Sequence, residues 1–584
     1  MSVVLGGTVA CAGRPSEPAK SVAPSPLSVA VPPPGAAEAP RPDEVLAAKD
    51  LARQFEQRLQ ARFPDLSGKF VSIEMGMHLT DVMDADVDAA ETFAVTASTD
   101  RTARVWSLRD GKQLAVLRVP QLGIAAELNT VAVAPAGDRV ALAGYDGGVY
   151  VFDTSNWHLS AQIPLLRKTV HTLRYSRDGK RLALGGHGRG GLKIYETSHY
   201  QLIFEDGDFD ADIYGLAFDA AGVLAVTSWD HSVRLYSPQH RLLAKKVFPN
   251  RPYRVAFDPA RKRLLVGFSD GAIARVLKVP SLDTERELEP PAGSSSSLGA
   301  VAFATDGSEI FASGRYNQAD GRKPILRWKA DFTPLEPWFL PQNTPECLRG
   351  ISGGKLLLTA QDPLVALFEP SGSLVWSALN RVPAFGKQPA AHFHASRDAS
   401  LVEFDWGRGS ERAAFDIRHP ALLEADPRRG LTPATTQSSR IDVQRWENQL
   451  DPTLAGQRLD VQRFEVCRSL AISGQSFLLG CEWDAYAFDE SGQRLWKRGT
   501  DGSARGAFLS ENGQLGVLAL DDGSLRWLNA ATGDELVNVA FVGSERDWVA
   551  WTPEGFYVGT PRGEHAVGLS VLRSAGSVEF VPLE

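Results

Sequence analysis

The sequence contains few cysteines and no long apolar run. Only four of its 584 residues are cysteine, and none belongs to a CxxC pair, which argues against a zinc finger or a disulfide-rich scaffold. No stretch approaches the roughly 18 apolar residues of a transmembrane helix. We therefore expect a globular body without a membrane span.

A basic excess is also missing. Lysine and arginine number 62 against 70 acidic residues, so the formal net charge is −8. Proteins that bind nucleic acid usually carry a basic patch or stripe, and none is evident along the chain. Nucleic acid is therefore not an expected partner.

The residues that are abundant favour turn-rich β structure. The chain is 43% hydrophobic and 23% charged, a balance typical of a globular protein with ample core. It contains 53 glycines and 13 tryptophans, with many Asp-Gly and Ser-Gly pairs between short apolar runs. This composition predicts an all-β fold.

One unit of a repeat is spelled out between residues 76 and 106. Apolar and polar residues alternate there, and a tight turn falls at Asp100, which predicts three strands joined by turns. Later units align on the residue that ends the third strand, in steps of 46, 43, 41 and 40 residues. The aligned residues are Trp106, Phe152, Tyr195, Tyr236 and Val276. A period of about 42 predicts a β-propeller.

The number of repeats predicts two rings. We count about eleven blades and one doubtful unit, whereas propellers usually close at four to eight blades. We therefore expect two tandem propellers of four-stranded antiparallel blades, with about seven blades in residues 65–385 and about five in 386–584. The last two units are expected at 504–540 and 546–572. A strand from 68–80 is the candidate for closing a ring and covering its edge.

The first 64 residues differ from the repeats. Residues 1–12 partly resemble a bacterial lipoprotein signal that ends before Cys11, which predicts lipidation of that cysteine; the alternative is an incidental cysteine. Residues 13–42 hold nine prolines and predict a disordered linker. Residues 43–64 show apolar side chains at four-residue spacing and predict one amphipathic helix.

Four side chains of the first repeat match the spacings of a WD-repeat blade. They are His78, Ser98, Asp100 and Trp106. The resemblance implies a structural relay of hydrogen bonds from the indole through the serine and histidine to the aspartate. The alternative is a hydrolase triad. We favour the relay, because Ser98 lies within an apolar strand rather than beside an exposed oxyanion site.

A narrower resemblance covers residues 70–572. The strings FEVCRSLAISGQSFLLGCEW, DDGSLRWLNAATGDELVNVAF and DWVAWTPEGFYVGTPRGEHAVG resemble the closing blades of bacterial WD-repeat proteins often linked to caspase-like peptidase domains. The printed chain leaves no room for such a domain. The resemblance therefore implies a scaffold without catalytic activity or cofactor.

The remaining cysteines and two histidines are candidates for bonds or ligands. Cys467 and Cys481 are symmetric about a predicted hairpin turn, so they face each other, either as a disulfide or as two buried thiols; Cys347 is then unpaired. His392 and His394 share a strand face but lack a third ligand, so we expect no metal. The glycine-rich GGHGRGG at 185–191 is interpreted as a blade turn rather than a phosphate cradle, because no helix follows it.

A binding surface is expected where the loops of the first ring converge. In WD-repeat families the residue before the turn aspartate commonly lies on that face. Here these residues are Thr99, Tyr145, Trp229 and Ser269. Trp229 is the strongest candidate, because an aromatic side chain can anchor a peptide, although it could equally cover a neighbouring blade.

These observations predict a non-catalytic, monomeric scaffold that binds a protein or peptide. Its expected location is the cell envelope, lipid-anchored or periplasmic, with the cytoplasm as the alternative. Other functions stay open: a regulatory subunit of a separately encoded caspase-like protease, an outer-membrane assembly lipoprotein, or a hydrolase. One chain cannot name the partner, because recognition by loops leaves no sequence pattern.

Overall fold

The computed structural model describes the chain from residue 71 to residue 582. Residues not described within this range are 75, 120–125, 164–168, 189–190, 291–292, 295, 319–321, 342, 380–382, 384, 386–391, 407–410, 464, 501, 543–545, 555 and 573–577. Cys11, the linker 13–42 and the helix 43–64 lie outside the described residues. Within them, no helix is both long and apolar enough to cross a bilayer.

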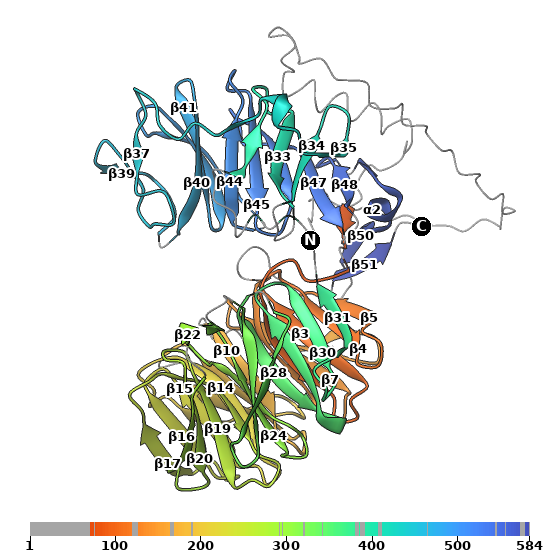
Figure 1. The fold of residues 1–584 in the computed structure, drawn as a ribbon, viewed down its shortest axis with the longest axis vertical. Coiled ribbons are helices and arrows are strands. Elements are labelled where there is room, and N and C mark those ends of the chain that lie inside the picture. Colours follow the sequence, from red (N-terminus) through yellow and green to blue (C-terminus); the bar gives the residue numbers. More distant parts are fainter. Residues whose placement is uncertain are drawn as a thin grey trace, which may run out of the picture.

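Seven four-stranded antiparallel sheets follow one another along the N-terminal half and form the blades of a β-propeller (Figure 1). Their strands are β2 (Val82–Val87), β3 (Phe93–Ser98), β4 (Ala103–Ser107) and β5 (Gln113–Leu117); β6 (Leu128–Val133), β7 (Arg139–Gly144), β8 (Val149–Asp153) and β9 (His158–Ile163); β10 (Val170–Tyr175), β11 (Arg181–Gly186), β12 (Leu192–Glu196) and β13 (Leu202–Asp206); β14 (Ile213–Phe218), β15 (Leu224–Ser228), β16 (Ser232–Tyr236) and β17 (Leu242–Val247); β18 (Pro252–Phe257), β19 (Arg263–Phe268), β20 (Ala274–Lys278) and β21 (Thr284–Leu288); β23 (Ala300–Phe303), β24 (Glu309–Ser313), β26 (Pro324–Lys329) and β27 (Pro334–Phe339); and β28 (Pro345–Ile351), β29 (Lys355–Ala360), β30 (Leu364–Phe368) and β31 (Leu374–Leu379). A small pair, β22 (Gly293–Ser294) with β25 (Asn317–Gln318), accompanies the sixth blade.

The residues aligned in the sequence do end, or nearly end, third strands. Trp106 lies in β4 and Tyr236 closes β16. Burial explains why the third strands could be recognised by their apolar residues: β16 is buried along its whole length, whereas the fourth strand β17 is largely exposed. Inner strands therefore form the core between blades, and fourth strands form the outer edge.

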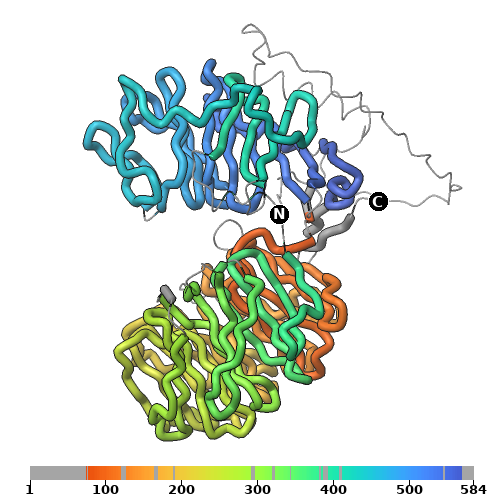
Figure 2. The backbone as a smooth tube through the Cα atoms, viewed as in Figure 1, coloured from red at the N-terminus to blue at the C-terminus, as the bar shows by residue number. Residues whose placement is uncertain are grey.

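The first and seventh blades lie side by side and close the ring (Figure 2). The guanidinium of Arg349 on β28 donates to the carbonyl of Ala85 on β2 at 3.1 Å. The Trp376 indole donates to the Leu108 carbonyl at 2.9 Å and stacks near Trp106, with ring centroids 6.5 Å apart. Closure thus uses packing of side chains between complete blades.

The stretch 68–80 does donate a strand to a distant part of the chain, as expected, but this strand is not added to the first ring. Residues Val71–Ile73 form β1, which pairs with β50 (Val567–Leu572) from the other end of the chain. β50 also pairs with β51 (Val578–Pro582). The seventh blade supplies its own four strands, so no strand needs to be added to it.

The C-terminal sheets vary more in size than the blades of the first ring. They comprise five strands, β32 (His394–Ala395), β33 (Leu401–Asp405), β34 (Arg412–Asp416), β35 (Ala421–Glu424) and β36 (Thr432–Pro433); three strands, β37 (Val443–Gln444), β38 (Thr453–Leu454) and β39 (Gln457–Arg458); four strands, β40 (Cys467–Ser473), β41 (Ser476–Cys481), β42 (Asp484–Asp489) and β43 (Arg494–Gly499); and six strands, β44 (Ala504–Leu509), β45 (Leu515–Leu520), β46 (Leu525–Asn529), β47 (Glu535–Val542), β48 (Asp547–Trp551) and β49 (Tyr557–Gly559). Short helical turns lie at η3 (Ser352–Gly354), η6 (Pro427–Arg429) and α2 (Pro561–His565).

The units expected at 504–540 and 546–572 are not separate blades. β47 pairs with β46 on one edge and with β48 on the other, with Asn538 opposite Trp551, so 504–559 forms one continuous sheet. The eight-residue length of β47 lets it extend past β46 and begin the next hairpin. A spacing argument cannot detect this, because a hairpin between two blades and a hairpin within one sheet have the same alternating pattern.

A buried relay of hydrogen bonds ties the first blade together, and its hydroxyl belongs to Thr96. The Trp106 indole donates to Thr96 Oγ1 at 2.8 Å, which lies 2.7 Å from His78 Nε2. His78 Nδ1 donates to Asp100 at 3.0 Å. Burial lowers the pKa of His78, so the ring is neutral with its proton on Nδ1.

Ser98 is therefore not part of the relay, contrary to the sequence-based expectation. Its hydroxyl donates to the Thr80 carbonyl at 3.4 Å and accepts from the Asp100 amide at 3.1 Å. Thr96 and Ser98 face the same way on β3, two residues apart, so both satisfy the spacing. Ser98 lies at the strand end, where it completes the turn instead.

Two hydroxyl substitutions separate these roles. Thr96→Val leaves the Trp106 indole and His78 Nε2 without a buried partner, and we expect it to lower the free energy of unfolding by about 1–3 kcal/mol. Ser98→Ala should cost less, because turn backbone bonds remain. Trp106→Ala should cost about 3–5 kcal/mol through lost core volume. Urea unfolding of the three variants measures the order; Ser98→Ala costing more than Thr96→Val would contradict the relay.

Candidate functional site

The turns between second and third strands lie at one end of the first ring, which we call the turn face. In each blade, a turn amide donates to the loop that enters the first strand of the same blade. Trp229 N bonds to the Asp212 carbonyl at 2.9 Å, and Tyr145 N bonds to Glu127 at 3.1 Å. These bonds hold the turns and the entering loops together as one surface.

All four residues expected at a binding face lie on the turn face, but they do not meet. Thr99 Oγ1 lies 2.8 Å from the Thr80 hydroxyl, and Ser269 Oγ donates to the Arg251 carbonyl at 3.4 Å. Tyr145 is 44% exposed. Only Trp229 belongs to a larger group of side chains that could act together.

An aromatic cluster surrounds Trp229 and spans the third, fourth and fifth blades. We define it as His171, Tyr214, Trp229 and Tyr253. The Tyr214 ring lies at its centre, 4.5 Å from His171, 4.4 Å from Trp229 and 5.2 Å from Tyr253 between centroids. A glycine at 215 permits this packing, since a Cβ there would come within 2.4 Å of the Tyr253 carbonyl.

Polar groups surround the aromatic cluster. The Arg251 guanidinium lies over the Trp229 ring at 5.6 Å. Tyr253 donates to the buried carboxylate of Glu346 at 3.3 Å, and burial raises the pKa of that carboxyl. The Trp229 indole N–H is buried and has no hydrogen-bond partner among the described residues. An unpaired buried donor calls for an acceptor, and the described residues do not supply one.

Three ligand-type side chains meet at the edge of this cluster, and sequence reasoning did not bring them together. His171 Nε2 lies 3.3 Å from Asp212 Oδ2, and His187 Nδ1 lies 2.9 Å from Asp212 Oδ1. Burial lowers the pKa of His171 to about 4. The residues come from three segments in two blades. The one signal in the sequence was the glycine-rich GGHGRGG, which lacks the usual turn aspartate and carries His187 at the position of Trp229 in the next repeat.

The turn face of the first two blades contacts the C-terminal sheets. Arg101 donates to the Thr500 carbonyl at 3.5 Å. Burial raises the pKa of Glu127 to about 7; the charge of Arg101 opposes the shift, and the charges of Asp521 and Glu482 from the C-terminal sheets contribute to it. Burial likewise raises the pKa of Asp521 to about 6. Acidic groups from both halves therefore crowd together at this junction.

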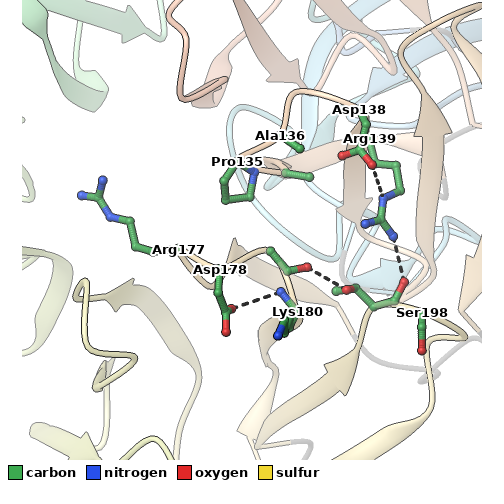
Figure 3. A pocket seen from close by; sticks show the side chains of 11 residues that line it. Pro135, Ala136, Asp138, Arg139, Arg177, Asp178, Lys180 and Ser198 are labelled. Atoms are coloured by element: carbon green, nitrogen blue, oxygen red, sulfur yellow. Dashed lines mark hydrogen bonds and ion pairs between the residues drawn. The ribbon is translucent and has the colours of Figure 1, made fainter.

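A shallow cavity of about 370 Å³ lies at the opposite end of the second and third blades (Figure 3). Three of its charged side chains, Asp138, Arg139 and Asp178, bond to the protein itself. Arg139 lies 3.3 Å from Asp138 and donates to the Thr197 carbonyl at 2.8 Å, while Asp178 accepts from the Lys180 amide at 3.1 Å. The charges of the lining are mixed in sign, and the bonds of these three side chains to the protein leave them poorly placed to act on a ligand together.

The remaining expected sites are structural in character. Cys467 and Cys481 face each other across β40 and β41 and form a disulfide with an S–S distance of 2.01 Å. Cys347 is buried and unpaired. His392 donates to Asp405 at 2.8 Å, and the Arg412 guanidinium lies 3.1 Å from His394. A guanidinium at that distance disfavours a second cation.

Comparison with known proteins supports the assignment of the first blade as a WD repeat. The WD domain, G-beta repeat family matches residues 71–107. The chain carries a WD40 repeat. SEC12-like protein 1 of Arabidopsis thaliana is 35% identical over 123 residues, or 21% of this chain, and the match spans 31% of that relative. The β-propeller domain of Cps50 (Swd1) from Myceliophteria thermophila is 13% identical with a TM-score of 0.41, over 47% of this chain and 93% of that domain.

The WD40 relay gives no support to hydrolysis by Ser98. His78 bonds to Thr96 and Asp100, and Ser98 bonds to Thr80 and the turn backbone. A nucleophile requires an adjacent base and access for a substrate, whereas Thr96, Ser98 and His78 are all fully buried. These residues therefore hold the WD40 blade together.

The crowded acids predict a pH-dependent stability at the junction. The pKa of Glu127 is raised above its unfolded value, so folding favours the protonated form and stability falls as pH rises from about 5 to 8. We expect Glu127→Gln to be more stable than the parent at pH 8 by roughly 1–2 kcal/mol and equal to it near pH 5.

Urea unfolding at both pH values measures this difference. Glu336→Gln, at an exposed position on β27, is the matched control and should follow the parent at both. A gain for Glu127→Gln that is the same at pH 5 and pH 8 would contradict the electrostatic cause.

Proposed function

We propose that the protein is a non-catalytic interaction scaffold whose first ring binds a peptide segment of a partner protein at the aromatic cluster. The observation that carries this proposal is the Trp229 indole N–H, buried beside exposed Arg251 and lacking a partner among the described residues. The chain carries a WD40 repeat at residues 71–107, and loops that converge on one face of a rigid scaffold are where binding residues concentrate.

The chemistry of the cluster indicates what the peptide contributes. Tyr214, Trp229 and Tyr253 offer a platform of flat rings, which suits an extended segment with an apolar or aromatic side chain. Arg251 and the Trp229 N–H both donate, so the segment must bring a carbonyl or carboxylate oxygen close to them. An acceptor on the partner would complete the hydrogen bonding of the face.

The location proposed for the scaffold is the cell envelope. Disulfides persist in oxidising compartments and are rare in the cytosol, and the bond between Cys467 and Cys481 supports export. Attachment through a lipid on Cys11 stays a prediction. Mass spectrometry of membrane-fraction protein, with Cys11→Ala as the comparison, tests it.

The partner class distinguishes the remaining functions. If the protein is a regulatory subunit, its affinity purification should recover a separately encoded caspase-like protease. If it is an assembly factor, the purification should recover outer-membrane insertion machinery. Both would use the same docking face.

Replacing Trp229 tests the docking face. We expect Trp229→Ala to reduce recovery of the partner at least about tenfold in quantitative affinity purification, because an interface anchor typically contributes 2 kcal/mol or more. Trp229→Phe should lose less, since it keeps the ring and removes only the N–H. The thermal unfolding midpoint should change little, because Trp229 lies at the surface of the ring.

Trp157→Ala is the matched control, because this tryptophan lies in the β8–β9 turn at the opposite end of its blade and packs against Phe93. It should recover the partner as well as the parent does. Equal recovery by Trp229→Ala would remove the aromatic cluster from the binding surface.

A further inference from the structure

We propose that His171, His187 and Asp212 form a binding site for one divalent transition-metal ion of the zinc class. The sequence-based expectation of no metal considered only His392 and His394, and this proposal departs from it. It does not rest on the proposed function, because metal binding can be measured without any partner.

The ligand atoms already lie close together. The two imidazole nitrogens and a carboxylate oxygen lie within 4.8 Å of one another. Each histidine approaches a different oxygen of Asp212, at 3.3 Å for His171 and 2.9 Å for His187. Ligands around a tetrahedral zinc ion are roughly 3.3 Å apart, from zinc–ligand distances of about 2.0–2.1 Å. Small side-chain rotations therefore suffice to enclose an ion.

The backbone holds each ligand from a different element. His171 lies in β10, His187 follows β11, and Asp212 directly precedes β14 in the next blade. The turn at His187 continues through Gly188 at φ +51°, and the Gly188 amide donates to Asp212 Oδ1 at 2.9 Å. This bond orients the carboxylate as outer partners of metal ligands do.

The donor set selects the kind of ion. His171 Nε2 is buried, points towards Asp212, and makes no hydrogen bond within the described residues. Two imidazoles with one carboxylate suit zinc and its neighbours, whereas calcium and magnesium prefer oxygen ligands alone. His187 is 61% exposed, so a fourth position faces solvent and can take water or a ligand from another molecule.

The position of the site gives it a structural consequence. An ion would join the third blade to the fourth at the turn face, where the His171 ring packs against Tyr214 of the aromatic cluster. Binding would therefore fix the side of the cluster nearest the third blade.

The test is metal titration of the full chain after treatment with a chelator. We expect isothermal titration to give one Zn²⁺ per chain with micromolar or tighter affinity, and Co²⁺ to give the intense visible absorption of a tetrahedral site. His187→Ala should weaken Zn²⁺ binding at least about 100-fold. It is the preferred variant, because its exposed side chain can be removed without disturbing the core. Asp212→Asn should weaken binding as well.

His392→Ala is the matched control. His392 also pairs with an aspartate and is 53% exposed, but the neighbouring imidazole, that of His394, contacts the Arg412 guanidinium. It should bind Zn²⁺ as the parent does. The proposal is overturned if the parent binds no stoichiometric Zn²⁺, if His187→Ala binds as tightly as the parent, or if His392→Ala abolishes binding.

Discussion

A buried carboxylate at the centre of the first ring is the constraint on which the rest of that ring depends. Asp84 on β2 accepts from Thr130 on β6 at 2.8 Å and from Arg174 on β10 at 3.0 Å, and Arg254 on β18 lies 3.9 Å away. Burial opposes ionisation, but the two guanidinium groups outweigh it and hold the pKa of Asp84 well below its usual range. A charge this deep is tolerated only when its partners surround it, so the inner strands of four blades must converge on one point.

The first blade contains two buried hydrogen-bond networks, one that connects its own strands and one that connects it to other blades. The relay from Trp106 to Asp100 joins strands within the blade, whereas Asp84 joins that blade to its neighbours. The Trp229 indole N–H, which has no partner among the described residues, differs from these networks in its position, because it lies on the turn face and not between blades.

The periodicity of the sequence predicted the blades of the first ring. The features that it did not predict depend on contacts between residues far apart in the sequence. Repeats of about 42 residues with turn aspartates located the blades, because each blade repeats the same local pattern. The relay hydroxyl was misassigned, since Thr96 and Ser98 share a strand face. The metal-type group was missed, because His171, His187 and Asp212 are assembled by the packing of neighbouring blades. The six-stranded sheet escaped detection for a related reason, as pairing partners rather than spacing determine where a sheet ends.

The sheet formed by β1, β50 and β51 joins the earliest described strand to the last ones. β1 enters the first ring directly, while its hydrogen bonds belong to the far end of the chain. The two halves of the chain are therefore connected twice: covalently by the segment after β31, and through the hydrogen bonds of this sheet. A protease that cut only between the two halves would leave them associated, and their separation would require β1 to be pulled out as well.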